Sequence, residues 1–220
     1  MKLLTVTIPC YNSQDYMEHC ISSLMKGGDR VQIIIIDDGS RDKTGEIADK
    51  YAAEYPDMIK AVHQPNGGHG EGINAGIRNA DGKYFKVVDS DDWVSDDFPA
   101  FLDALEQHDA EGGADLIVTN YYYEHADGKG NRSICYSNIF PENVIHGWNK
   151  TKSFRIHQLL TIHSCTFRTS VFKEYGKELP KHIFYEDNLM VYQLLPYCKK
   201  LLYLNMDLYR YFIGREGQTV

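Results

Sequence analysis

The sequence lacks a long apolar run and an excess of positive charge. No stretch approaches the roughly 20 apolar residues that a membrane-spanning helix needs. The first residues, MKLLTVTIPCYN, contain too short an apolar part for a secretory signal. The net charge of -8 argues against broad, non-specific nucleic-acid binding. These absences predict a cytoplasmic protein, with room left for peripheral contact at the inner face of a membrane.

Paired cysteines are also lacking. The five cysteines are an odd number and include no C-x-x-C pair; they are Cys10, Cys20, Cys135, Cys165 and Cys198. This pattern is typical of reduced structural thiols and argues against a disulfide framework or a zinc site.

What the sequence does contain is a regular alternation of strand-like and helix-like segments over its first ~110 residues. The segment VQIIIID is an almost continuous β-branched run, as expected for a strand buried on both faces of a parallel sheet. Strands are predicted at 3–8, 31–37, 58–64 and 83–89, and helices at about 15–25, 43–55, 70–80 and 98–107. The alternation predicts an α/β fold with a doubly wound, mostly parallel sheet and helices on both faces.

The second half of the chain is less regular. The segment ADLIVTNYYYEH predicts a strand, and Asp127-Gly128 indicates a hairpin turn after it. Helices are predicted at about 151–160 and 186–195, with one or two strands near the end. Without a linker or internal repeat, residues 1–220 are interpreted as one domain.

Polar residues follow three of the predicted strands, where ligands bind in open α/β sheets. Pro9, Tyr11 and Asn12 follow the first strand, Asp38 follows the second, and the DSDD sequence at 89–92 follows the fourth. One such polar turn is usually just a turn or a helix cap. Three on one edge of a sheet favour a shared ligand site.

The three carboxylates of Asp89, Asp91 and Asp92 repel one another unless a positive partner neutralises them. Acidic residues ahead of a helix could account for Asp96 and Asp97, but less well for Asp89 and Asp91 at a strand end. Oxygen ligands at this spacing suit Mg²⁺ or Mn²⁺. A calcium-binding EF-hand is excluded, because the loop lacks the required glycine.

The glycine-rich stretch NGGHGEG, residues 66–72, matches neither standard phosphate-binding loop. Its glycines still allow a ligand to approach the backbone at a helix N-terminus, although a plain flexible turn fits nearly as well. Within it, His69 could be a ligand contact or an exposed loop residue.

Two further candidates lie near the end of the chain. The sequence YEDN, residues 185–188, opens a predicted helix. By spacing alone, its acidic residues fit the first turn of a helix and a general base equally well. Arg210 and Arg215 could clamp a phosphate or be solvated.

Taken together, these segments resemble family 2 glycosyltransferases with the GT-A fold, an inverting group that uses nucleotide sugars. The matching segments extend from residue 6 to 219: VTIPCYN, IIIIDDGSRDKT, NGGHGEGINAGIRNADGKYFKVVDSDDWV and, more weakly, IFYEDN and YRYFIGREGQT. The resemblance implies a donor-binding half over about residues 1–95 and an acceptor-binding half over about 96–220. It also suggests a role in polysaccharide biosynthesis at the cell envelope.

The resemblance assigns roles to individual residues. Asp187 corresponds to the general base, and the metal ligands are Asp91 with Asp89 or Asp92. The donor-binding set is Pro9, Tyr11, Asn12, Asp38, Gly68, Asn74, Ser90, Arg210 and Arg215. The implied reaction is metal-dependent transfer of a hexose or N-acetylhexosamine from a UDP-sugar to a hydroxyl of a glycan or glycolipid.

Two alternative functions remain open. A sugar-1-phosphate nucleotidyltransferase has a related sheet and also uses a metal, but it usually carries a basic, glycine-rich loop after the first strand, which PCYNSQDYMEH lacks. A binding module that keeps the nucleotide pocket without turnover is the non-enzyme alternative.

Overall fold

The first four strands form a parallel sheet, as the sequence predicts. The computed structural model describes residues 1–215, and the sheet order begins β3-β2-β1-β4. The strands are β1 (Leu4–Cys10), β2 (Val31–Asp37), β3 (Ile59–His63) and β4 (Tyr84–Val87). The connecting helices are α1 (Met17–Met25), α2 (Thr44–Glu54) and α3 (His69–Arg78), with a 3-10 turn at Gly28–Arg30. The polar turns after these strands therefore meet at one edge.

Strand β2 shows why helices cover both faces of the sheet. Successive side chains of a strand point to opposite faces. Ile33 and Ile35 belong to the main core with α1, whereas Ile34 and Ile36 form a separate cluster with Ala75 of α3. Helix α3 also packs closely against β1, because a Cβ atom on Gly76 would collide with the side chain of Thr7.

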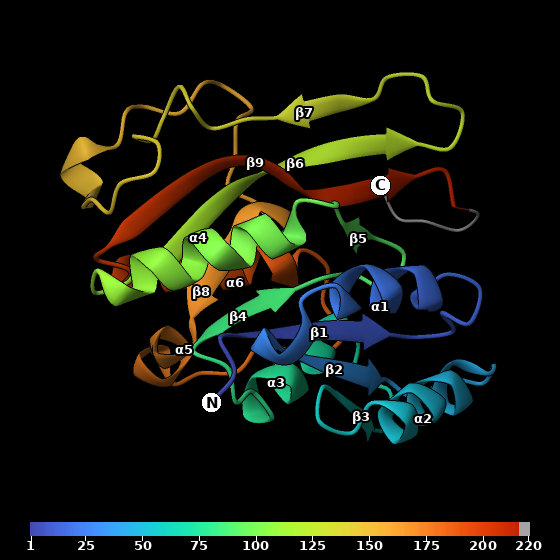
Figure 1. The fold of residues 1–220 in the computed structure, drawn as a ribbon. Helices are drawn as coiled ribbons and strands as arrows, with labels where there is room; N and C mark the ends of the chain where they lie inside the picture. Colours follow the sequence, from blue (N-terminus) through green and yellow to red (C-terminus); the bar gives the residue numbers. More distant parts are fainter. Residues whose placement is uncertain (216–220) are drawn as a thin grey trace.

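Beyond β4 the sheet becomes mixed, which qualifies the expectation of a mostly parallel sheet. Its order continues β4-β8-β6-β9-β5, with β7 paired to β6 (Figure 1). Strand β8 (Cys165–Arg168) is antiparallel to both β4 and β6 (Leu116–His125). Strand β9 (Leu201–Ile213) is parallel to β6 and antiparallel to β5 (Trp93–Val94). The long β9 thus reaches from the core of the second half to the turn that follows β4.

The remaining elements confirm most predictions. Helix α4 (Phe98–Ala110), helix α6 (Glu186–Leu194) and a single final strand occupy the predicted places. Gly128, with a φ of +69°, lies in the turn between β6 and β7 (Arg132–Ile134). Helix α5 (Thr169–Tyr175) and the 3-10 turns Trp148–Lys150, Ile162–Ser164 and Leu195–Tyr197 were not predicted. Among the described residues, every helix is too short or too polar to cross a bilayer.

The helix predicted at 151–160 is wrong. Residues 151–160 form turns and irregular structure. The apolar residues Phe154, Ile156 and Leu159 of this segment are exposed, Ile156 to 86%. A short helix depends on burying one apolar face, and here Phe154 meets the core only edge-on at Phe140, with ring centres 6.1 Å apart, while Ile156 stays in solvent.

Candidate functional site

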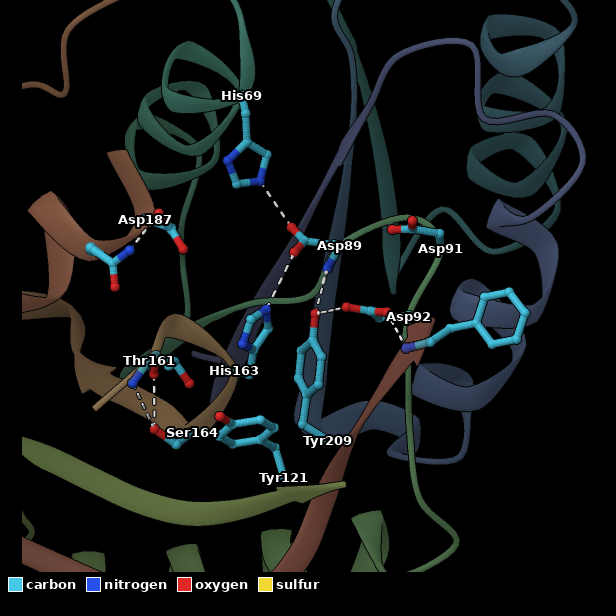
Figure 2. A network of polar contacts seen from close by, with 12 residues as sticks. His69, Asp89, Asp91, Asp92, Tyr121, Thr161, His163, Ser164, Asp187 and Tyr209 are labelled. Atoms are coloured by element: carbon cyan, nitrogen blue, oxygen red, sulfur yellow. Dashed lines mark hydrogen bonds and ion pairs between the residues drawn. The ribbon is translucent and has the colours of Figure 1, made fainter. Parts of the chain in front are cut away.

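A cleft of about 610 Å³ lies at the carboxyl end of β4. It brings together the acidic turn (residues 89–92), the glycine-rich turn, the 3-10 turn at 162–164, the start of α6 and the end of β9. Its lining residues are Pro9, His69, Asp89, Ser90, Asp91, Asp92, His163, Ile183, Phe184, Tyr185, Glu186, Asp187, Asn188, Tyr211 and Arg215. The acidic turn and the predicted base therefore face the same space (Figure 2).

Asp89 lies between two histidines. His69 Nε2 is 2.9 Å from Asp89 Oδ1, and His163 Nε2 is 3.8 Å from Asp89 Oδ2 (Figure 2). Burial by itself would raise the pKa of Asp89, but the two histidines outweigh burial and hold the pKa well below its usual range. Asp89 is therefore a fixed negative charge.

Asp91 is the member of the acidic turn that contacts an arginine. Its Oδ2 accepts a hydrogen bond from Arg215 Nε at 2.9 Å. Burial and the nearby charge of Asp89 nevertheless raise the pKa of Asp91, and Arg215 only partly opposes them. An additional cation at this carboxylate is electrostatically favoured.

Asp92 is held by β9. Tyr209 Oη donates to Asp92 Oδ2 at 2.6 Å, and the backbone nitrogen of Phe212 donates to Oδ1 at 2.8 Å. Asp92 is 1% exposed, and burial followed by the charges of Asp89 and Asp91 raises its pKa well above the usual value. Both of its oxygens already have protein partners.

The donor set fits a divalent cation. Ligand atoms of Asp89, Asp92 and His163 lie within 4.8 Å of one another, and Asp91 borders the same cleft. The carboxylate oxygens suit Mn²⁺ or Mg²⁺, whereas an imidazole nitrogen is more typical of zinc, copper, iron or nickel sites. The His163 Nδ1 atom is buried and has no hydrogen-bond partner among residues 1–215.

A buried lysine holds the backbone of the segment that contains His163. Lys86 in β4 is 1% exposed, and its Nζ donates to the carbonyl oxygens of His163 at 2.8 Å and Cys165 at 3.2 Å. Burial lowers the pKa of Lys86 to about 8. The lysine fixes the backbone that carries His163 beside Asp89.

His69 lines the cleft and contacts two carboxylates of the chain, so it is more than an exposed loop residue, while a contact with a ligand stays a prediction. Its side chain is 32% exposed, and its Nδ1 is 2.9 Å from Glu186 Oε1 while its Nε2 contacts Asp89. Burial alone would lower the pKa of His69, but the two carboxylates outweigh burial and raise it to about 10. His69 therefore carries a positive charge between two acidic segments.

The predicted base lies on the far side of the cleft from the acidic turn. Asp187 is half-buried in the first turn of α6, and Asn188 Nδ2 donates to its Oδ1 at 3.3 Å. The residues before it are exposed: Ile183 to 40%, Phe184 to 80% and Tyr185 to 78%. Asp187 thus lies in the cleft next to a group of exposed, mostly apolar side chains.

Asp38 and Asn74 lie at the predicted edge but bond to backbone. Asp38 is 4% exposed, and its carboxylate accepts from the backbone nitrogens of Gly67 and Gly68 at 2.9 and 2.8 Å. Asn74 is 3% exposed and exchanges two hydrogen bonds with the backbone of Leu179. In the structure Asp38 therefore fixes the backbone of the glycine-rich turn, and Asn74 fixes the backbone at Leu179.

The other predicted donor residues divide into two groups. Pro9 and Ser90 line the cleft, and Ser90 Oγ is 2.8 Å from Ser13 Oγ. Tyr11 is 50% exposed, and Asn12 accepts from the backbone nitrogen of Arg41 at 2.9 Å; neither lines this cleft.

Arg210 and Arg215 also separate. Arg215 lines the cleft, whereas the guanidinium of Arg210 lies 4.7 Å from the ring centre of Tyr122, beside a different hollow. Of the two arginines, only Arg215 lines the cleft that holds the acidic turn, and a donor contact by Arg210 stays a prediction.

Sequence reasoning missed His163, Glu186 and Tyr209. His163 follows an irregular segment, and Tyr209 lies inside a strand, so neither stands next to a recognisable turn. Glu186 was present in YEDN but was attributed to an acidic first helical turn. Only the pairing of β9 with β5 and β6 brings Tyr209 to the acidic turn.

The sheet order and the acid-lined cleft at the carboxyl ends of the strands are typical of the GT-A fold. Residues 5–176 match the family model described as Glycosyl transferase family 2, and the chain belongs to this family. This confirms the resemblance seen in the sequence.

Curated relatives agree with this assignment. The chain is 28% identical to Glycosyltransferase GlyA of Streptococcus pneumoniae serotype 4 over 97% of its own length and 31% of that protein. It is also 28% identical to Glycosyltransferase GlyG of the same organism, over 96% of its own length and 70% of that protein. The chain thus spans about a third of GlyA.

Solved structures share the fold. S. aureus TarS 1-349 in complex with UDP-GlcNAc superimposes with a TM-score of 0.78 at 23% identity, covering 99% of this chain and 60% of that one. The mannosyltransferase PcManGT from Pyrobaculum calidifontis, in complex with GDP-Man and Mn²⁺, superimposes with a TM-score of 0.66 at 14% identity, covering 97% of this chain and 58% of that one.

Proposed function

We propose that the chain transfers a hexose or N-acetylhexosamine from a nucleotide sugar, with a UDP-sugar as the favoured donor, to a hydroxyl of a glycan or glycolipid. The single observation that carries the proposal is the cleft that places the acidic turn opposite Asp187. The binding of UDP-GlcNAc by TarS, a structural neighbour, supports the choice of donor.

The roles follow from the chemistry of the cleft. Asp89 and Asp91, with Asp92 or His163, would hold Mg²⁺ or Mn²⁺, which offsets the negative charge that grows on the diphosphate leaving group. Arg215 is placed to bind the same diphosphate. Asp187 takes the proton of the acceptor hydroxyl as that oxygen attacks, on the face opposite the leaving group, so the anomeric configuration inverts.

Several assignments stay predictions of the sequence. They include donor contacts by Tyr11, Asn12, Asp38, Gly68, Asn74 and Arg210, the division into a donor half and an acceptor half, and the cytoplasmic location. Contact with the inner face of a membrane belongs with them.

The test measures nucleotide-sugar binding and turnover separately. Thermal-shift assays with UDP-GlcNAc, UDP-glucose and GDP-mannose, with and without Mn²⁺, should give a shift that requires the metal. Release of UDP from the binding donor, in water and with a panel of glycan acceptors, then reports turnover, and NMR gives the anomeric configuration of the product.

The matched variant is Asp187→Asn. We expect it to retain UDP binding and to lose about 10²–10⁴-fold in transfer, because a general base contributes on that order. Full transfer activity in Asp187→Asn would contradict the role of this residue. Pyrophosphate release from a nucleoside triphosphate would instead identify a nucleotidyltransferase, and UDP binding without turnover a binding module.

A further inference from the structure

The segment that leads into α6 is fastened to the glycine-rich turn and α3. The backbone nitrogen of Leu179 donates to Asn74 Oδ1 at 2.9 Å, and Asn74 Nδ2 donates back to the carbonyl oxygen of Leu179 at 2.9 Å. The backbone nitrogen of His182 donates to the carbonyl oxygen of Gly67 at 3.2 Å. Two segments more than 100 positions apart in the chain are therefore joined through their backbones.

The glycines of this turn make the close approach feasible. A Cβ atom on Gly70 would lie 3.0 Å from the carbonyl oxygen of Pro180 and 3.2 Å from Glu186 Cγ. Both distances are shorter than ordinary van der Waals contact. In this structure, the glycine at position 70 lets the start of α6 lie directly against α3.

His69 stands at the centre of this contact. Its Nε2 faces Asp89 Oδ1 at 2.9 Å, and its Nδ1 faces Glu186 Oε1 at 2.9 Å. An ionised carboxylate only accepts hydrogen bonds, so each ring nitrogen donates one. His69 thus connects the acidic turn to the residue that immediately precedes Asp187.

The bridge has a fixed geometry. An imidazole ring is rigid, so its two nitrogens hold their partners at a set separation and direction. Glu186 is 8% exposed, and charge-assisted hydrogen bonds in such partly buried places are stronger than neutral ones. The helix dipole disfavours a positive charge at the N-terminus of α3, where His69 lies. The two carboxylates that contact His69 offset this effect.

We infer that His69 is a positioning residue that sets the place of Asp187 relative to the acidic turn, and so couples the donor side of the cleft to the base. The inference rests on the proposed function and adds to it a residue with no direct part in proton transfer. Its physical basis is that an error of about 1 Å in the placement of a reacting group can cost on the order of 10²-fold in rate.

The kinetic test uses His69→Gln, whose two N–H donors share one nitrogen and so cannot replace two donors on separate ring nitrogens. We expect kcat for hydrolysis of UDP-GlcNAc to fall by at least about tenfold, with the Kd for UDP changed by no more than about twofold. His69→Lys, which keeps a positive charge and several donors, should recover part of kcat. The control is His19→Gln, an exposed histidine of α1 outside this cleft.

A double-mutant cycle isolates the bridge. Combining His69→Gln with Glu186→Gln should cost much less than the product of the two single effects, since each variant breaks the same contact. Independent, multiplicative effects would overturn the inference. An unchanged kcat would overturn it as well, and an unchanged kcat with a loss of UDP affinity would place His69 in donor binding alone.

Amide hydrogen exchange gives a readout that does not depend on turnover. In His69→Gln the amides of residues 179–188 should exchange faster than in the unchanged protein, while those of β1 and β2 keep their protection. Unchanged exchange at 179–188 would overturn the inference. If the unchanged protein neither binds nor turns over a nucleotide sugar, the proposed function fails, and the exchange result still decides whether the bridge orders this segment.

Discussion

The two sides of the cleft are built in opposite ways. On one side, each carboxylate of the acidic turn has fixed partners: Asp89 contacts His69, Asp91 contacts Arg215, and Asp92 is held by β9. On the other side, Ile183, Phe184 and Tyr185 are exposed, and Tyr185 adopts a left-handed backbone conformation with a φ of +64°.

This difference fits what each side would bind under the proposed function. A diphosphate and a cation have a defined charge and geometry, and preorganised charges stabilise them without rearrangement during the reaction. A glycan acceptor offers a larger and more variable surface, for which exposed aromatic and aliphatic side chains supply apolar contact. Fixed side-chain contacts are therefore concentrated where the charges are.

The largest effect is expected on the charged side, from Asp91→Ala. Transfer should fall by a factor on the order of 10³, because a carboxylate proposed to hold the cation is lost. The melting temperature should not fall, since burial and Asp89 already disfavour a charge at this position.

Activity assays and thermal denaturation of Asp91→Ala check both statements. The matched control is Asp96→Ala, which removes an exposed carboxylate paired with Lys26 at 2.6 Å and should leave transfer within about twofold. Transfer by Asp91→Ala at a level near that of this control would refute the assignment.

An intermediate effect is expected from Tyr209→Phe, which loosens the fixed side. The fully buried hydroxyl donates to Asp92 and accepts from the backbone nitrogen of Asp89 at 3.2 Å. Its loss leaves two buried polar groups without their partner, so the free energy of unfolding should fall by about 1–3 kcal/mol.

Urea denaturation measures this loss. Tyr192→Phe on α6, where the side chain is 44% exposed, is the comparison and should change stability by no more than about 0.5 kcal/mol. Equal stability losses in the two variants would remove the contrast between a fixed and an open side.

The smallest effect on stability is expected on the open side, from Tyr185→Gly. The side chain is 78% exposed, and glycine adopts a positive φ without steric cost. The free energy of unfolding should therefore change by no more than about 0.5 kcal/mol, while the KM for a glycan acceptor rises. A stability loss well above that value would show that Tyr185 packs as a core residue.

The first half of the fold could be predicted because local sequence and tertiary structure agree there. Strand β2 is almost entirely β-branched, and each polar turn ends a strand. In the second half they disagree: the apolar residues at 154, 156 and 159 are exposed, and β8, a strand of four residues, carries no distinct pattern.

The acidic turn and Asp187 could be predicted as parts of the site, but their partners could not. His163 and Tyr209 reach Asp89 only through the pairing of distant strands. Asn74 lay in a segment that suggested donor contacts, and the structure shows its amide bonded to Leu179. A sequence motif indicates which residues approach a site, whereas the fold decides which atoms remain available to a ligand.

Strand β9 has a consequence for how the catalytic unit is delimited. The region that matches the family model ends at residue 176, yet Tyr209, Phe212 and Arg215 hold two of the three aspartates in the acidic turn. A fragment cut at the end of that region would keep the acidic motif and lose the groups that orient it. The smallest piece able to reproduce the site therefore extends at least to Arg215.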